Sequence, residues 1–395
     1  MERFIRHFLV LALVAAFLTT GLPQFLARFF NNDFHITDMY YQIRDDQHDP
    51  FEEEVVLVNV SSLSREGVAK EIFHLAQYQP KVIALDIIFM GERDSVGDGL
   101  LQYVLMNTPN VVLIGESQRK ADNSGDSLVV SHPMFSSFTY HGIGENIVDA
   151  NVGRRMQKKY YFADGDSALH FATQIAMLYD STKALEFLKR PNKQENIYFL
   201  GNIPSYEENP KPSKFSVLDV EDVMQENFTP DLIQGKIVLM GYLGEYAGDP
   251  GIIEDKFFSP LKAYIPVKTP PDMFGVVFHA NTISMILNQR FIEQLSPEEE
   301  GQFAFAICFF NVLILLLILW GKHTRKWFLV LSASLVVVEI ASYPQIAIYL
   351  FDKYRYLAEL TYTPFLVALS PYIARIYVHR LLRMFSDYWW QKTDY

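Results

Sequence analysis

The sequence predicts an α/β domain with a mixed or mostly parallel sheet, placed between one N-terminal and three C-terminal transmembrane helices. Two observations support this fold class. Long uncharged apolar stretches occur near both ends of the chain but not in its middle. In the middle, short runs of β-branched and aliphatic residues alternate with stretches of helical periodicity, which is typical of strands joined by crossover helices. At 395 residues, the chain can bury a core without metal or disulfide cross-links.

The first membrane span is expected at residues 8–25. This stretch is uncharged, follows Arg3 and Arg6, and is long enough for a bilayer core, which takes about 20 helical residues. A cleaved signal peptide is the alternative. The apolar run is longer than the usual signal-peptide core and is followed by no clear small-residue cleavage site, so we expect an uncleaved anchor.

The first half of the middle region alternates regularly. Residues 54–60 (EVVLVNV) predict a strand, residues 64–78 an amphipathic helix, and residues 81–89 (KVIALDIIF) a second strand. A short helix around residues 100–105 and a third strand at residues 110–115 follow. This order, with its short connections, predicts a parallel sheet with right-handed crossovers.

The second half of the middle region is less regular. We expect a helix at residues 167–179 and strands at residues 196–200 and 236–241. Proline-rich residues 209–213 and 264–272 should be loops, because proline lacks the donor that a sheet ladder needs. With no internal repeat and no flexible linker, the region is expected to be one domain.

Three further spans are expected at residues 302–320, 327–351 and 360–378. Basic residues precede the first span, fill the loop between the second and third, and follow the fourth. The positive-inside rule then places these segments and both termini in the cytoplasm. The expected organisation is a cytoplasmic N-terminus and first helix at residues 1–30, an extracytoplasmic domain at 31–300, three transmembrane helices at 301–378 and a short cytoplasmic tail at 379–395.

Composition excludes several functions. The chain has 34 Lys and Arg against 46 Asp and Glu, a net charge of −12, so no nucleic-acid partner is expected. Cys308 is the single cysteine, so no disulfide within one chain and no Cys/His zinc site can form. No P-loop, GxGxxG or HExxH motif occurs, and no nucleophile has a base at recognisable spacing. We therefore expect no catalytic residues, no metal ligands and no cofactor.

Six separated blocks give the chain a resemblance to a known family, the CHASE2 extracellular sensor domain of bacterial transmembrane receptors. The blocks are ITDMYYQIRD, EVVLVNVSSLSREG, QPKVIALDIIF, GKIVLMGYLG, DKFFSPL and FGVVFHANTISMIL. They follow the family's order and cover most of residues 34–290. The resemblance implies a location in the bacterial inner (plasma) membrane and a signal passed to a cytoplasmic kinase, nucleotide cyclase or similar output. Because residues 379–395 are too few to fold as an output domain, we expect a separate membrane or cytoplasmic signalling partner, or a homo-oligomer.

Four polar residues are candidates for a ligand site. Asp86 interrupts the apolar run KVIALDIIF near the carboxyl end of a predicted strand, where open α/β sheets commonly bind ligands. Asp255, His279 and Asn281 belong to the two last blocks of the resemblance and are expected to converge there. The alternative is structural: Asp86 caps a loop, Asp255 sets a turn, and His279 and Asn281 are polar residues at the start of a helix.

Asn311 and Glu339 form a second candidate cluster. They lie near the middle of the second and third spans, and antiparallel neighbours would bring them to the same depth. An ionisable residue there costs about 3 kcal/mol, so Glu339 should face the bundle and hydrogen-bond the Asn311 amide. A proton pathway is the alternative, but no further acids or histidines are in line with the pair.

The predicted function is that of a non-enzymatic membrane receptor that detects an extracytoplasmic signal and passes it to a separate protein. A structural or scaffold subunit of a bacterial envelope complex is the alternative, and an enzyme is a distant third. The sequence identifies neither the ligand nor the partner.

Overall fold

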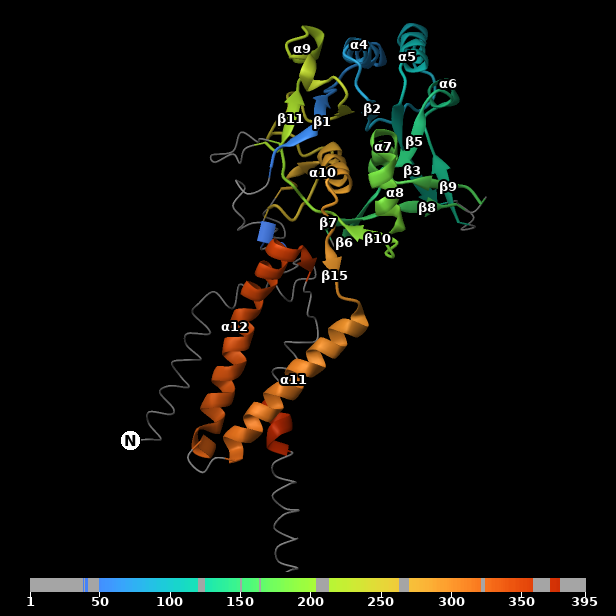
Figure 1. The fold of residues 1–395 in the computed structure, drawn as a ribbon. Coiled ribbons are helices and arrows are strands. Elements are labelled where there is room, and N and C mark those ends of the chain that lie inside the picture. Colours follow the sequence, from blue (N-terminus) through green and yellow to red (C-terminus); the bar gives the residue numbers. More distant parts are fainter. Residues whose placement is uncertain are drawn as a thin grey trace, which may run out of the picture. The chain divides into compact units, whose positions relative to one another are not determined.

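The computed structural model describes residues 38, 40–41, 50–119, 125–149, 151–162, 165–203, 213–262, 270–320, 324–357 and 370–376. The chain divides into two compact units. One consists of residues 41–292, and the other of residues 1–40 together with residues 293–395. Element labels follow Figure 1.

The unit of residues 41–292 is built on a seven-stranded sheet of order β11-β1-β12-β2-β3-β4, in which β5 also pairs with β3. All pairings are parallel except that of β4 with β3. The predicted α/β class with a mixed, mostly parallel sheet is confirmed. The strands are β1 (Glu52–Asn59), β2 (Val82–Leu85), β3 (Val111–Arg119), β4 (Asp126–Val129), β5 (Tyr140–Ile143), β11 (Phe215–Leu218) and β12 (Ile237–Gly241).

Helices cover both faces of this sheet, as Figure 1 shows. On one face, α4 (Arg65–Ala76), α5 (Ser95–Asn107) and α9 (Val220–Met224) bury a continuous apolar core against alternate strand residues. The opposite face packs against α7 (Phe171–Tyr179) and α10 (Gly275–Leu287), with α8 (Ser181–Lys189) beside them. Every residue of β2 and β12 is buried. This double coverage explains why these strands read as continuous apolar runs.

Local signals fix the ends of the predicted helices. The Ser64 side chain accepts a hydrogen bond from the Gly67 N–H, so α4 begins one residue after its cap. Asp94 caps α5 in the same way, accepting from the Gly97 N–H at 2.6 Å. The predicted helix at residues 167–179 begins later, at Phe171, because residues 167–169 form a short strand, β9 (Ser167–Leu169).

Two predicted strands differ from the structure. The run KVIALDIIF was expected to be a strand throughout, but β2 ends at Leu85, and the Asp86 N–H makes the last bond to β12, to the Met240 carbonyl. The strand expected at residues 196–200 ends at Asn196, as β10 (Gln194–Asn196), and residues 197–200 are buried outside any sheet. In both places, the apolar side chains are buried although the backbone is irregular. The spacing of apolar residues alone cannot distinguish such a segment from a strand.

Smaller sheets and short helices complete this unit. A three-stranded sheet joins β10, β7 and β6, while β8 pairs with β9 and β13 with β14. The remaining elements are α6 (Pro133–Ser136), β6 (Asn146–Asp149), β7 (Val152–Gln157), β8 (Lys159–Tyr161), η1 (Pro230–Leu232), β13 (Lys256–Phe257) and β14 (Met273–Phe274).

The second unit contains two long helices, α11 (Pro297–Trp320) and α12 (Phe328–Tyr354), joined through η2 (Thr324–Trp327). Strands β15 (Glu293–Gln294) and β16 (Tyr356–Leu357) pair in parallel at the opposite end of this helix pair. Leu315, Phe328 and Ala374 bury one another, so the helical stretch at residues 370–376 packs against both long helices.

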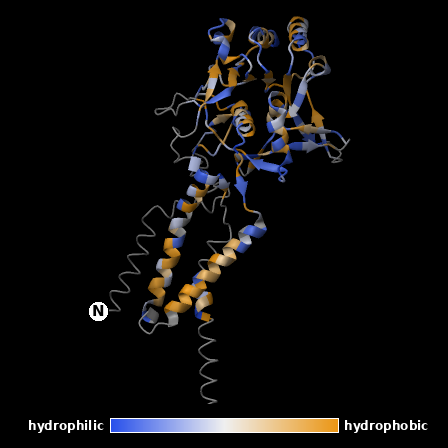
Figure 2. Cartoon of the chain, viewed as in Figure 1, coloured by the Kyte–Doolittle hydropathy of each residue, from blue (hydrophilic) through white to orange (hydrophobic). Residues whose placement is uncertain are grey.

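One helical segment within the described residues, Gly301–Ile318, is long and apolar enough to cross a membrane, and the apolar part of α12, Phe328–Glu339, is shorter. Figure 2 shows the hydrophobic character of these helices. Phe305 and Leu317 of α11 are largely exposed, as lipid-facing residues would be. The span predicted at residues 8–25 lies outside the described residues, and of the span at 360–378 only residues 370–376 are described. The count of four spans therefore stays a prediction.

Candidate functional site

A cavity of about 320 Å³ lies at the carboxyl edge of the parallel strands. Residues directly after β2 and β5, the middle of β3, and the first turns of α10 line it. The structure brings three of the four predicted residues, Asp86, Asp255 and His279, into this lining. Side chains from blocks far apart in the sequence thus meet at one sheet edge, where open α/β sheets bind ligands.

Asp86 stands immediately after the last residue of β2 and is partly buried. Burial raises the pKa of its carboxyl group to about 7, and the negative charge of Asp255 adds to the effect. Gly241 makes room for it: a Cβ on Gly241 would lie 3.1 Å from the Asp86 Cβ and 2.8 Å from the Val276 Cβ. A side chain at Gly241 would push α10 away from the edge of the sheet.

Asp255 lies at the rim of the cavity in a turn with a left-handed backbone, at φ 58°. Its carbonyl accepts the Gly275 N–H at 3.0 Å, which ties the turn to the start of α10. Partial burial of the carboxyl group and the neighbouring charge of Glu254 raise its pKa to about 6. Because the residue as a whole is exposed, water screens this effect, and Asp86 is the more strongly perturbed of the two acids.

His279 is only 2% exposed, and its imidazole lines the cavity from the second turn of α10. Its ring packs edge-on against Phe171, 5.1 Å between centroids, and lies 5.6 Å from the ring of His170. Burial lowers its pKa to about 4, so the ring is neutral at physiological pH. Within the described residues, its Nδ1 has no hydrogen-bond partner.

Asn281 was expected to join these residues, but it lies outside the cavity lining. Its Oδ1 accepts the N–H groups of Leu200 and Gly201, at 2.7 and 3.1 Å. Its Nδ2 donates to the carbonyls of Gly201 and Val277. Asn281 therefore replaces the missing sheet partner of the irregular segment after β10, which corrects its assignment to the ligand site.

Several lining residues were not predicted from the sequence. Glu116, Glu145 and Asn146 line the cavity, together with the aromatic rings of Phe257 and Phe278. Glu116 follows the predicted strand at residues 110–115, so the reasoning that selected Asp86 would have found it. Glu145 and Asn146 follow β5, whose four residues, YHGI, carry no recognisable strand pattern.

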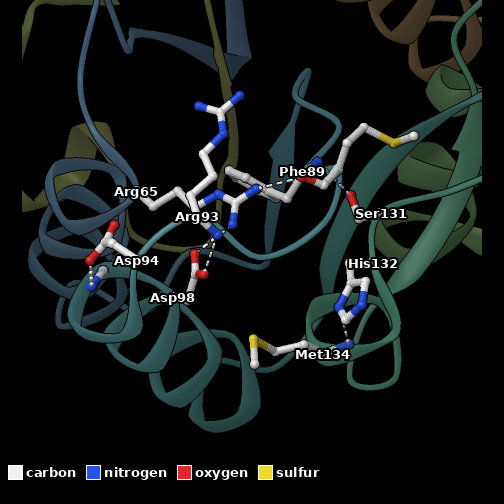
Figure 3. A network of polar contacts seen from close by, with 10 residues as sticks. Arg65, Phe89, Arg93, Asp94, Asp98, Ser131, His132 and Met134 are labelled. Atoms are coloured by element: carbon white, nitrogen blue, oxygen red, sulfur yellow. Dashed lines mark hydrogen bonds and ion pairs between the residues drawn. The ribbon is translucent and has the colours of Figure 1, made fainter.

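A buried polar network fixes the loop that leads away from Asp86. As Figure 3 shows, Arg65 of α4 forms an ion pair with Asp98 of α5, and Asp98 also accepts the Arg93 N–H at 2.7 Å. Arg65 donates to the Met90 carbonyl at 3.0 Å. The Phe89 N–H donates to the Ser131 hydroxyl at 3.0 Å. These bonds anchor residues 89–93 to α4, to α5 and to Ser131.

The second predicted cluster forms in the other unit. The Asn311 amide donates to the Glu339 carboxyl group at 2.7 Å, which links α11 to α12. Asn311 is 3% exposed. The structure thus contains the expected hydrogen bond between Asn311 and Glu339.

Among the residues that the structure describes, no group of three or more His, Cys, Asp or Glu is placed to hold a metal ion. The arrangement at the cavity instead suits non-covalent binding, with carboxyl oxygens, a neutral imidazole and aromatic rings around a space of small-ligand size.

The fold and the cavity define a class of protein: an α/β domain with a ligand-sized pocket at its strand ends, continuous in sequence with a helix of membrane length. Comparison with family models specifies the family. Residues 9–321 match the CHASE2 domain, and the chain belongs to this family of extracytoplasmic sensory domains of signalling proteins. No catalytic domain was identified. Neither the curated proteins nor the solved structures gave a match.

Proposed function

We propose that the protein is a non-enzymatic membrane receptor that binds a small extracytoplasmic ligand in this cavity and reports occupancy to a separate protein. The observation that carries the proposal is the convergence of Asp86, Asp255 and His279 on one cavity at the carboxyl edge of the sheet. Acids with raised pKa values and a desolvated imidazole are costly to maintain, and such groups concentrate at functional sites.

The connection to the membrane runs through α10. Phe278 and His279, in its first turns, line the cavity. The chain continues from the end of α10 at Leu287 to the start of α11 at Pro297 through a short link that contains β15. A ligand that binds one position of α10 better than another would shift the population of that position, and the link would carry the shift towards α11.

The receptor is proposed to reside in a bacterial inner membrane with four spans, the sensory domain outside and both termini in the cytoplasm. The basic residues around the predicted spans and the extracytoplasmic location of CHASE2 domains support this orientation. A signalling partner in the membrane or cytoplasm would receive the output.

The test is thermal unfolding of the full chain in detergent against a panel of small molecules of every charge class, followed by affinity purification from native membranes. A receptor should gain thermal stability with at least one compound, and Asp86→Asn should lose that gain. Glu186→Gln, an exposed acid on α8, is the matched control and should keep it. Co-purification of a stoichiometric partner, with no compound stabilising the chain, would instead support the scaffold function.

A further inference from the structure

We propose that the ligand of this cavity is a small organic cation that carries N–H donors, such as a primary ammonium or guanidinium compound. The inference rests on the proposed receptor function and specifies its ligand class. It follows from the charge, the hydrogen-bonding groups and the aromatic rings of the lining.

The charge of the lining is one-sided. Asp86, Glu116, Glu145 and Asp255 contribute four carboxyl groups, and no lysine or arginine is among the described residues that line the cavity. An anionic ligand would meet repulsion from every ionised carboxylate, whereas a cation would supply the countercharge that the lining lacks. The raised pKa values of Asp86 and Asp255 are the expected signs of carboxyl groups without such a countercharge.

Hydrogen-bonding capacity points to the same class. An ionised carboxylate only accepts hydrogen bonds. The Asn146 Oδ1, also an acceptor, is buried without a partner in the described part of the chain. The buried His279, neutral and with an unpartnered Nδ1, is a further polar group in the lining. A ligand rich in N–H groups would satisfy the carboxylate oxygens of the lining, which a ligand made only of acceptors would leave unpaired.

The aromatic groups complete the match. Phe257 and Phe278 both line the cavity, with ring centroids 6.1 Å apart at a nearly perpendicular angle. Aromatic faces attract ammonium and guanidinium groups, most strongly where water is excluded. The volume of about 320 Å³ suits a small molecule rather than a peptide.

One feature of the site would favour an anion, namely the N-terminus of α10 beside the cavity. Its first N–H, that of Gly275, is already bonded to the Asp255 carbonyl at 3.0 Å. The Asp255 carboxyl oxygens also lie next to Gly275, 3.6 and 3.7 Å from where a Cβ would stand. The protein's own acid therefore occupies the position that an anionic ligand would take.

The experiment compares three four-carbon compounds that differ in charge: 1,4-diaminobutane, 1,4-butanediol and succinate. Isothermal titration calorimetry with the full chain in detergent measures each dissociation constant. We expect the diamine to bind and the other two not to. Asp86→Asn and Asp255→Asn should each weaken binding by about tenfold or more, because each removes a charge without changing shape. Glu186→Gln should leave the dissociation constant unchanged, and thermal unfolding of each variant verifies folding.

The outcomes separate this inference from the receptor function. Equal binding of the diol and the diamine, or tighter binding of succinate, would overturn the cation assignment while leaving a ligand-binding receptor. Absence of diamine binding to the folded parent at millimolar concentration would also overturn it, and the broader compound panel would then decide the receptor function separately. Diamine binding that Asp86→Asn and Asp255→Asn both leave intact would place the cation elsewhere and reject this site.

Discussion

Glu71 shows, at the scale of one residue, how burial of a carboxyl group links the stability of this fold to pH. The side chain lies on the inner face of α4 with 0% exposure, and neither carboxyl oxygen has a hydrogen-bond partner in the described part of the structure. Burial raises its pKa to about 8, and the charge of Asp219 contributes to the shift. The folded protein therefore holds a proton there that the unfolded chain releases above its ordinary pKa of 4.5.

Replacing Glu71 with Gln should flatten the dependence of stability on pH. Below the unfolded pKa both states are protonated, and stability falls as pH rises through the window from 4.5 to about 8. The parent can lose about 1 kcal/mol per pH unit there, whereas Gln does not titrate. Thermal unfolding of the full chain in detergent at weakly acidic and weakly alkaline pH measures the difference. Glu66→Gln, an exposed site on the same helix, should follow the parent, and a Glu71→Gln profile parallel to the parent would reject the buried proton.

Individual residues also show which parts of the candidate site could be predicted from the sequence. Asp86 was predictable because a carboxylate within an apolar strand must lie at its end or find a partner. Asn281 was assigned to the ligand site, but its side chain binds the irregular backbone at Leu200 and Gly201. Irregular backbone leaves no periodic pattern in the sequence, so this role could not be predicted. His279 reaches the cavity because it lies near the N-terminal end of α10, close to the sheet edge.

At the scale of elements, a strand or helix was predicted correctly where its pattern of apolar and capping residues is strong. Strands β1, β2, β3 and β12 and helix α4 were predicted because central parallel strands are buried on both faces and a capping serine marks the helix start. Strands β5 and β6 are short and partly exposed, and the mostly buried β7 carries Arg154 and Arg155, so no apolar run marks any of the three. The cavity wall that they support was missed with them.

The contact between α11 and α12 yields a prediction at this scale. Glu339→Gln should change stability very little, because an amide can still hydrogen-bond Asn311. Glu339→Leu leaves the Asn311 amide without a partner and should weaken helix association by roughly 0.5 to 2 kcal/mol. Asn311→Leu should be similarly harmful. The double Leu variant should recover part of the loss, since orphaning one polar group costs more than removing both.

Helix association is measured for these variants by unfolding in detergent, with the parent as reference. Equal stability of Glu339→Leu and the parent would reject an energetic role for the hydrogen bond. Loss of signalling in a normally folded Glu339→Gln variant would instead point to a proton pathway.

At the scale of the whole molecule, the proposed topology determines which side of the membrane each exposed residue faces. On a Cys308→Ser background, a cysteine at exposed Ser181 of α8 should react with a membrane-impermeant thiol reagent in cells with a permeable outer layer. A cysteine at exposed Lys326, between α11 and α12, should react only after the inner membrane is lysed. The reverse pattern would show an inverted protein, and labelling of both positions in unlysed cells would contradict a crossing by α11.

The short β15–β16 ladder has a mechanical consequence for the helix pair of the second unit. Glu293 pairs with Tyr356 and Gln294 with Leu357, and the Glu293 N–H donates to the Arg355 carbonyl at 2.8 Å. The ladder thereby connects the start of α11 to the end of α12. At the opposite end of the helix pair, η2 and the contact of Leu315 with Phe328 connect the two helices. Because α11 and α12 are connected at both ends, they resist sliding along one another, which would break the register of the ladder. Under the proposed receptor function, tilting or rotation of α11 and α12 together is the motion that would keep this ladder intact.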